Sequence, residues 1–255
     1  MPGIGVGISD PFLEHIGVGS VIIIVPPDPP VVEPETLSLT LPVPSQTQSG
    51  DMLLALISTD GNPTMTEPIG WDLEDQIGGT AKSFIYRRLS PGNEPTSYTW
   101  TLDGAEDAVG AIIRFLNVDP NNPINTKEKT SGTGSTISVP AITTTVDSAM
   151  LLTLISLNDG VLIDPNSLAA QYQKGIWLVN SSGETIGSVG SSASYRTLKR
   201  ADTFPAYNLT TQGLVSTDYY VIEIALSPDA DVLYTLLDSS PSRLLDSNAD
   251  KLLAE

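Results

Sequence analysis

Carboxylates are the side chains of this sequence with the most potential for chemistry. Asp72, Glu74 and Asp75 fall in one predicted strand, and Glu106 and Asp107 open another. A glycoside hydrolase needs only two carboxylates facing each other across a cleft, and Asp72 and Glu74 would share one face of a strand. Because the chain contains 30 Asp and Glu residues, such pairs are also expected on a solvated surface without function. The surface interpretation is favoured, and no catalytic residue is assigned.

Other catalytic residue types are scarce. The single histidine, His15, lies in a glycine-rich segment, which argues against a Ser–His–Asp triad and excludes a multi-histidine metal centre. The absence of cysteine excludes thiolate chemistry and disulfides. The sequence GIGVG at residues 3–7 precedes any predicted strand, whereas a dinucleotide-binding motif follows one. We therefore expect a protein that is not an enzyme and that binds no cofactor.

Two pairs of residues offer oxygen ligands for calcium. Asp229 and Asp231 form one pair, and Asn158 and Asp159 form the other. Neither pair completes a twelve-residue EF-hand loop, so no metal site is assigned, although loop-bound calcium stays open.

The tryptophans suggest either a binding platform or a core. Trp71, Trp100 and Trp177 would provide a sugar-stacking surface if they were exposed. Trp71 follows PIG and Trp177 follows KGI, at similar places in the two halves of the chain, and this repeated placement favours a core role.

The composition limits the partners. The formal net charge of −18 opposes binding to nucleic acid and to anionic membranes. The apolar run at residues 21–25 is five residues long, far below the roughly 20 that span a bilayer. We expect neither nucleic acid nor a membrane as a partner.

The elements that position these residues occur twice. MLLALIS at 52–58 returns as MLLTLIS at 150–156, an offset of 98, and SFIYRRL at 83–89 matches SASYRTL at 192–198, an offset of 109 that pairs Tyr86 with Tyr195.

Short apolar and β-branched runs between turn residues predict an all-β fold. The expected strands are 36–41, 51–59, 70–76, 81–89, 97–102 and 106–118, then 135–140, 148–157, 175–179, 192–199, 206–210 and 218–227, with a weak helical pattern at 166–173. We predict a jelly-roll-like β-sandwich built from two similar halves. One sandwich or two stays open, and the single body is preferred.

The chain divides into five predicted segments. Five prolines in VPPDPPVVEP at 25–34 indicate an extended spacer behind a glycine-rich segment, and Leu-Leu followed by a polar or acidic residue recurs near the C-terminus. The segments are a docking arm at 1–35, a first sandwich half at 36–120, a linker loop at 121–134, a second half at 135–227 and a C-terminal Leu-Leu-acid arm at 228–255.

One stretch resembles the β-sandwich modules in structural proteins of tailed bacteriophages. It is GDMLLALISTDGNPTMTEPIGWDLEDQIGGTAKSFIYRRLSPGNEPTSYTW, with its Gly-Asp-Leu-Leu-Leu-like strand, Pro-x-Gly-Trp turn, Tyr-Arg strand and final EPTSYTW. The likeness covers residues 36–120 well and the second half more loosely, and RLLDSNADKLLAE is similar to the tails of phage virion proteins. The family defines no catalytic residues that could be transferred.

The resemblance implies a virion protein that is assembled in the host cytoplasm. Its partners would be other capsid, neck or tail proteins, and by analogy it would form a homo-oligomer, with a trimer as the first expectation. A carbohydrate-binding adhesion module that contacts a host-surface glycan through exposed tryptophans is the alternative. A glycan hydrolase that uses Asp72 and Glu106 is the third hypothesis.

Overall fold

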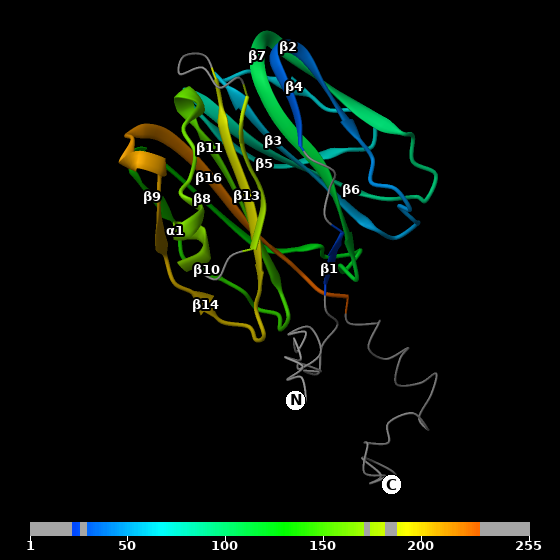
Figure 1. The fold of residues 1–255 in the computed structure, drawn as a ribbon. Helices are drawn as coiled ribbons and strands as arrows, with labels where there is room; N and C mark the ends of the chain where they lie inside the picture. The colour runs from blue at the N-terminus through cyan, green and yellow to red at the C-terminus, as the bar shows by residue number, and fades with distance from the viewer. Residues whose placement is uncertain (1–21, 26–29, 171–173, 182–187, 230–255) are drawn as a thin grey trace, which may run out of the picture.

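The apolar and β-branched runs of the sequence form antiparallel strands, and the all-β sandwich class is confirmed (Figure 1). The computed structural model describes residues 22–25, 30–170, 174–181 and 188–229. His15, Asp231 and most of the two predicted arms lie outside these residues. Within them, no helix has the length and apolar character needed to cross a lipid bilayer.

The first half is one sheet that folds over itself. Its strands are β1 (Ile23–Val25), β2 (Val31–Pro42), β3 (Met52–Asp60), β4 (Met65–Thr66), β5 (Asp72–Gly78), β6 (Ala81–Leu89) and β7 (Ser97–Leu116). The main order is β5-β6-β3-β7, and β1, β2 and β4 also pair with β7. The 20-residue β7 contributes both Trp100 and Ile112 to one buried cluster, so its two parts lie on opposite sides of the same core.

The second half repeats this order and is covered by different elements. Its strands are β8 (Ile124–Gly134), β9 (Thr136–Val139), β10 (Ile142–Thr143), β11 (Met150–Leu157), β12 (Lys174–Asn180), β13 (Gly190–Thr197), β14 (Thr203–Phe204), β15 (Tyr207–Thr210) and β16 (Thr217–Leu226). The sheet order β12-β13-β11-β16 corresponds to β5-β6-β3-β7, and β8 extends it. One face is covered by the β9–β15 and β10–β14 pairs and by the helix α1 (Pro165–Ala170).

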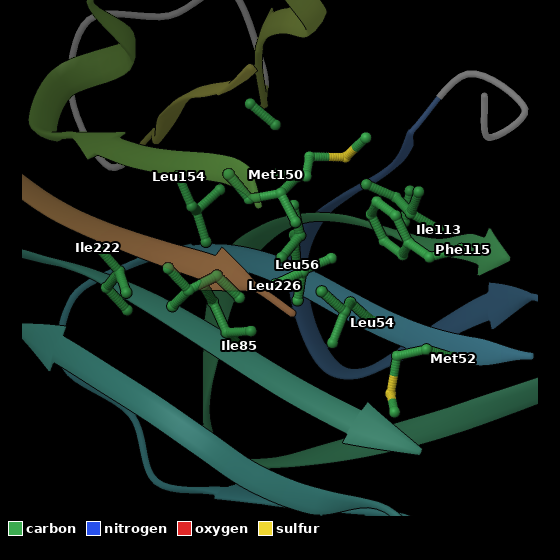
Figure 2. Packing of buried hydrophobic residues seen from close by; sticks show 14 of the residues in the cluster. Met52, Leu54, Leu56, Ile85, Ile113, Phe115, Met150, Leu154, Ile222 and Leu226 are labelled. Carbon is green, nitrogen blue, oxygen red and sulfur yellow. The ribbon is translucent and has the colours of Figure 1, made fainter. Parts of the chain in front are cut away.

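A third core joins the halves. Figure 2 shows side chains of both sheets meeting face to face, including Leu54 and Leu56 from β3, Leu154 from β11 and Ile222 from β16. Strands β3 and β11 therefore have a core on each side. Strands covered on both faces are continuous apolar runs rather than alternating ones. This explains why MLLALIS and MLLTLIS look alike: they are the central strands of the two halves.

Three sequence-based boundaries need correction. The expected linker 121–134 is mostly the strand β8, whose alternating Thr and Lys residues suit a solvated edge strand but look like a loop by composition. The strand expected from residue 36 begins at Val31, and β1 also pairs with β7, so the sheet extends into the predicted arm. The separate strands 97–102 and 106–118 are one strand, β7.

The register also corrects the second sequence match. Met52 lies opposite Leu89, and its equivalent Met150 lies opposite Thr197, so Leu89 corresponds to Thr197 rather than to Leu198. A one-residue shift moves a side chain to the other face of a strand. Accordingly, Tyr86 lies in the inner core of the first half, whereas Tyr195 packs against the core between the halves.

Candidate functional site

The carboxylates singled out in the sequence do not assemble as an acid pair. Asp72 lies in the edge strand β5, whereas Glu106 lies in the bent part of β7. Burial raises the pKa of Glu106, and the charges that raise it further are those of Asp60, Asp103 and Asp107, with Asp72 not among them. The hydrolase hypothesis built on Asp72 and Glu106 thus has no common site in the structure.

Two of these carboxylates connect the halves instead. Lys127 Nζ on β8 donates to Glu74 Oε1 at 2.9 Å and to the Glu74 carbonyl at 2.6 Å, and Lys129 Nζ contacts Asp75 Oδ1 at 2.7 Å. Arg87 Nε lies 3.0 Å from Glu74 Oε2. Because β5 and β8 are edge strands of different sheets, these ion pairs hold the two sheet edges together. The lysines also occupy edge carbonyls that would otherwise accept a foreign strand.

A second cluster of carboxylates lies at the C-terminal end of β3. The pKa of Asp60 is raised by burial and by the charges of Asp107 and Asp159. Asp107 is itself buried and accepts hydrogen bonds from Glu35 N at 2.8 Å and from Ser181 Oγ at 2.6 Å. Ser181 belongs to the second half, so Asp107 also has a structural role. Among the described residues, no three His, Cys, Asp or Glu side chains are placed to hold a metal ion.

The tryptophans are core residues, as expected, but their placement is not repeated: Trp71 and Trp100 lie in the inner core of the first half, whereas Trp177 lies in the core between the halves. Trp71, Trp100 and Trp177 are 3%, 0% and 6% exposed, respectively. Trp71 packs edge-on against Trp100 with ring centroids 5.1 Å apart, and Trp177 Nε1 donates to Ser191 Oγ at 3.0 Å. A sugar-stacking platform made of these three rings is therefore wrong.

Four buried serines form a seam between the halves, which the sequence did not single out. Ser58 Oγ lies 2.7 Å from Ser156 Oγ, Ser83 Oγ lies 2.7 Å from Ser156 Oγ, and Ser58 Oγ lies 2.9 Å from Ser191 Oγ. By register, Ser58 corresponds to Ser156 and Ser83 to Ser191. The bond pattern is thus nearly unchanged when the halves are exchanged, as in a two-fold symmetric interface. The signal in the sequence was the repeated final serine of MLLALIS and MLLTLIS.

Both chain ends leave the body at one end, which we call the terminal pole. Ile23 pairs with Leu116, the bridge between Val118 and Pro228 lies beside it, and Asp229 N donates to Asn117 O at 2.8 Å. Figure 1 shows β1 and the end of β16 at this position. The segments 1–21 and 230–255 are therefore attached to neighbouring points.

The strands of the first sheet also expose apolar side chains at the end where β1 pairs with β7, toward the opposite edge of the sheet. Leu89 lies opposite Met52 at this end of the sheet and is 45% exposed. Ile69 is 97% exposed in the turn before β5, and Arg88 Nη1 holds that turn by donating to Gly70 O at 2.9 Å. Ile69 is thus an exposed apolar side chain on a turn that Arg88 fixes in place.

In comparisons with models of known protein families, with curated proteins and with solved structures, nothing matches this chain.

Proposed function

We propose that this protein is a non-enzymatic structural component of a tailed-phage virion that docks through its terminal pole and displays the rest of its body. The attachment of both terminal segments beside residues 116–118 carries this proposal, because it gives them a common place of action. The exposed Ile69 and Leu89 lie at the same end of the strands, toward the edge of the first sheet opposite β1. The virion context itself rests on the sequence resemblance.

The contacts of the acidic residues that were candidates for chemistry support a structural role. Glu74 and Asp75 pair with Lys127 and Lys129 between the halves, and Asp107 binds Ser181 across the same junction. Side chains committed to such contacts stiffen the body. The glycan-adhesion alternative loses its main support because the tryptophans are buried.

The partners in this proposal are capsid, neck or tail proteins, together with further copies of the chain. Two attached segments and an apolar turn at one pole provide several weak contacts that act together, which raises avidity without a large rigid interface. The homo-oligomer, with a trimer expected first, would then follow the symmetry of the docking site.

Incorporation into particles tests the proposal. Infections complemented with variants lacking 1–21 or 230–255, or carrying Ile69→Asp, should yield particles depleted of the protein. Deletion is limited to residue 21 because a deletion through 35 would remove β1 and the start of β2. The matched control is Leu214→Asp, since Leu214 is 68% exposed in a turn beside the start of β16, away from the terminal pole.

Leu214→Asp should incorporate normally. Normal incorporation of both deletions and of Ile69→Asp would refute docking at the terminal pole. Equal loss with Leu214→Asp would show that the opposite end contributes as much.

A further inference from the structure

Glu223 is a carboxyl group enclosed in the core of the second half. It lies on β16 and is 0% exposed. Its neighbours on the same face of the strand, Val221 and Ala225, belong to the clusters beneath the β9–β15 and β10–β14 covers. An ionised carboxylate in such a place loses its hydration, which is unfavourable unless partners replace the water.

The partners of Glu223 are few. Thr153 Oγ1 on β11 donates to Glu223 Oε1 at 3.3 Å, a long hydrogen bond, while Glu223 Oε2 has no hydrogen-bond partner among the described residues. Tyr207 on β15 also hydrogen-bonds to this carboxyl group. Because Oε2 has no hydrogen-bond donor beside it, this environment stabilises the ionised form of Glu223 poorly.

The charged groups around Glu223 come from two further strands. Arg196 on β13 faces it, with its guanidinium carbon 3.9 Å from the Phe204 ring centre on β14 and 5.2 Å from the Tyr207 ring centre. Glu128 on β8 lies directly opposite Glu223 in the register and is exposed. The Arg196 guanidinium thus also interacts with the aromatic rings of Phe204 and Tyr207. The carboxylate of Glu128 does not attract an ionised Glu223, because both are negatively charged.

The first half has no carboxyl group at the position equivalent to Glu223. Thr153 pairs with Glu223 as Ala55 pairs with Ile112, so the equivalent residue in the first half is an isoleucine. Arg88, the equivalent of Arg196, has its carboxylate partner Glu94 beside it on the chain, with both Glu94 oxygens about 3 Å from Arg88 Nε. A buried carboxyl group at this position of the strand is therefore found in the second half and not in the first.

We propose that Glu223 is an acid-closed latch: with a proton on its carboxyl group the cover strands β14 and β15 stay closed on the second sheet, and loss of that proton weakens this closure. The inference does not depend on the proposed function. Burial raises the pKa of Glu223 from 4.5 to about 7, against the attraction of Arg196 and the hydrogen bonds of Thr153 and Tyr207.

The sign of the pH effect follows from linkage. In an open state Glu223 is hydrated and regains its ordinary pKa of 4.5, so closure takes up a proton between that pH and about 7. The stabilisation is complete below pH 4.5 and is lost as the pH rises to about 7. The opening equilibrium should rise about tenfold per pH unit inside this window.

Hydrogen exchange of the full chain at about pH 5 and about pH 7 tests the latch. Exchange in a peptide covering 203–210 is divided by exchange in one covering 84–89 of the first half, which cancels the intrinsic pH dependence of exchange and avoids the strand β7 that carries Glu106. For the wild type this ratio should rise at least about tenfold with pH. In Glu223→Gln it should stay constant, and in the control Glu128→Gln it should rise as in the wild type.

A flat wild-type ratio would overturn the proposal even if Glu223→Gln failed to fold. An unchanged pH dependence in a folded Glu223→Gln variant would also overturn it. Loss of the dependence in Glu128→Gln alone would assign the effect to the exposed carboxylate.

Discussion

The hydroxyl oxygens of Ser58 and Ser156 lie 2.7 Å apart although the residues are 98 positions apart in the chain. They are equivalent residues of the two halves, and each also binds the serine next to its partner, Ser191 or Ser83. Equivalent residues that touch each other mark a two-fold axis. The junction between the halves thus has the form of an interface between two identical subunits joined in one chain.

The serine seam should contribute measurably to stability. Ser156→Ala removes a hydroxyl that serves both Ser58 and Ser83, leaving buried polar groups without a partner, and should lower the free energy of unfolding by about 1–3 kcal/mol. Urea unfolding measures this. The exposed Ser131→Ala on β8 is the control and should have little effect. If Ser58→Ala and Ser156→Ala were strictly additive, the two hydroxyls would not be coupled.

Two ion pairs of similar length differ in burial, and we expect them to differ in their contribution to stability. Arg114 Nε and Asp51 Oδ2 are 2.6 Å apart with side chains 8% and 9% exposed, whereas Lys127 in its pair with Glu74 is 41% exposed. Arg114→Met leaves Asp51 charged in the interior and should cost about 3–5 kcal/mol of unfolding free energy. Lys127→Met should cost at most about 1 kcal/mol. Similar losses in urea unfolding would contradict this ranking.

Native tryptophan fluorescence should resist quenching. Because all three indoles are at most 6% exposed, acrylamide should quench the folded protein far less than the protein in concentrated urea. Strong quenching in the native state would place at least one ring at the surface and restore the adhesion alternative.

Neutralising Glu106 should stabilise the protein at neutral pH. Burial, followed by the charges of Asp60, Asp103 and Asp107, raises the pKa of Glu106, so its folded form favours the proton and stability is lost as the pH rises. The urea midpoint of Glu106→Gln should exceed that of the wild type at pH 7, and the difference should shrink toward pH 4.5. The exposed Glu33→Gln is the control. A difference that grew on acidification would reverse the assigned sign.

The strands that are buried on both faces could be predicted from the sequence. The continuous apolar runs at 52–58 and 150–156 predicted the two central strands, because covering both faces requires apolar residues at every position. Strand β8 was missed because a solvated edge strand has the same polar composition as a loop. The match of Tyr86 with Tyr195 was wrong by one position, since identical letters carry no information about which face a side chain occupies.

The interior polar groups could not be predicted in the same way. The sequence shows that Ser58 and Ser156 repeat, but only the packing of two sheets brings them together. Glu223 stands in the apolar run VIEIAL, and a charged residue at an inward position was a visible signal that was not used. Conversely, Asp72 and Glu106 were joined in the hydrolase hypothesis because both are acidic, and residue type says nothing about the distance between two side chains.

The neighbouring attachment points of residues 22 and 229 have a consequence for the covalent order of the chain. A short peptide joining them would close the backbone into a ring without crossing the body. New ends opened in the turn at 212–214 would then give a circular permutant with the same strand pairings, and a foreign peptide grafted into that turn would be presented away from the original ends.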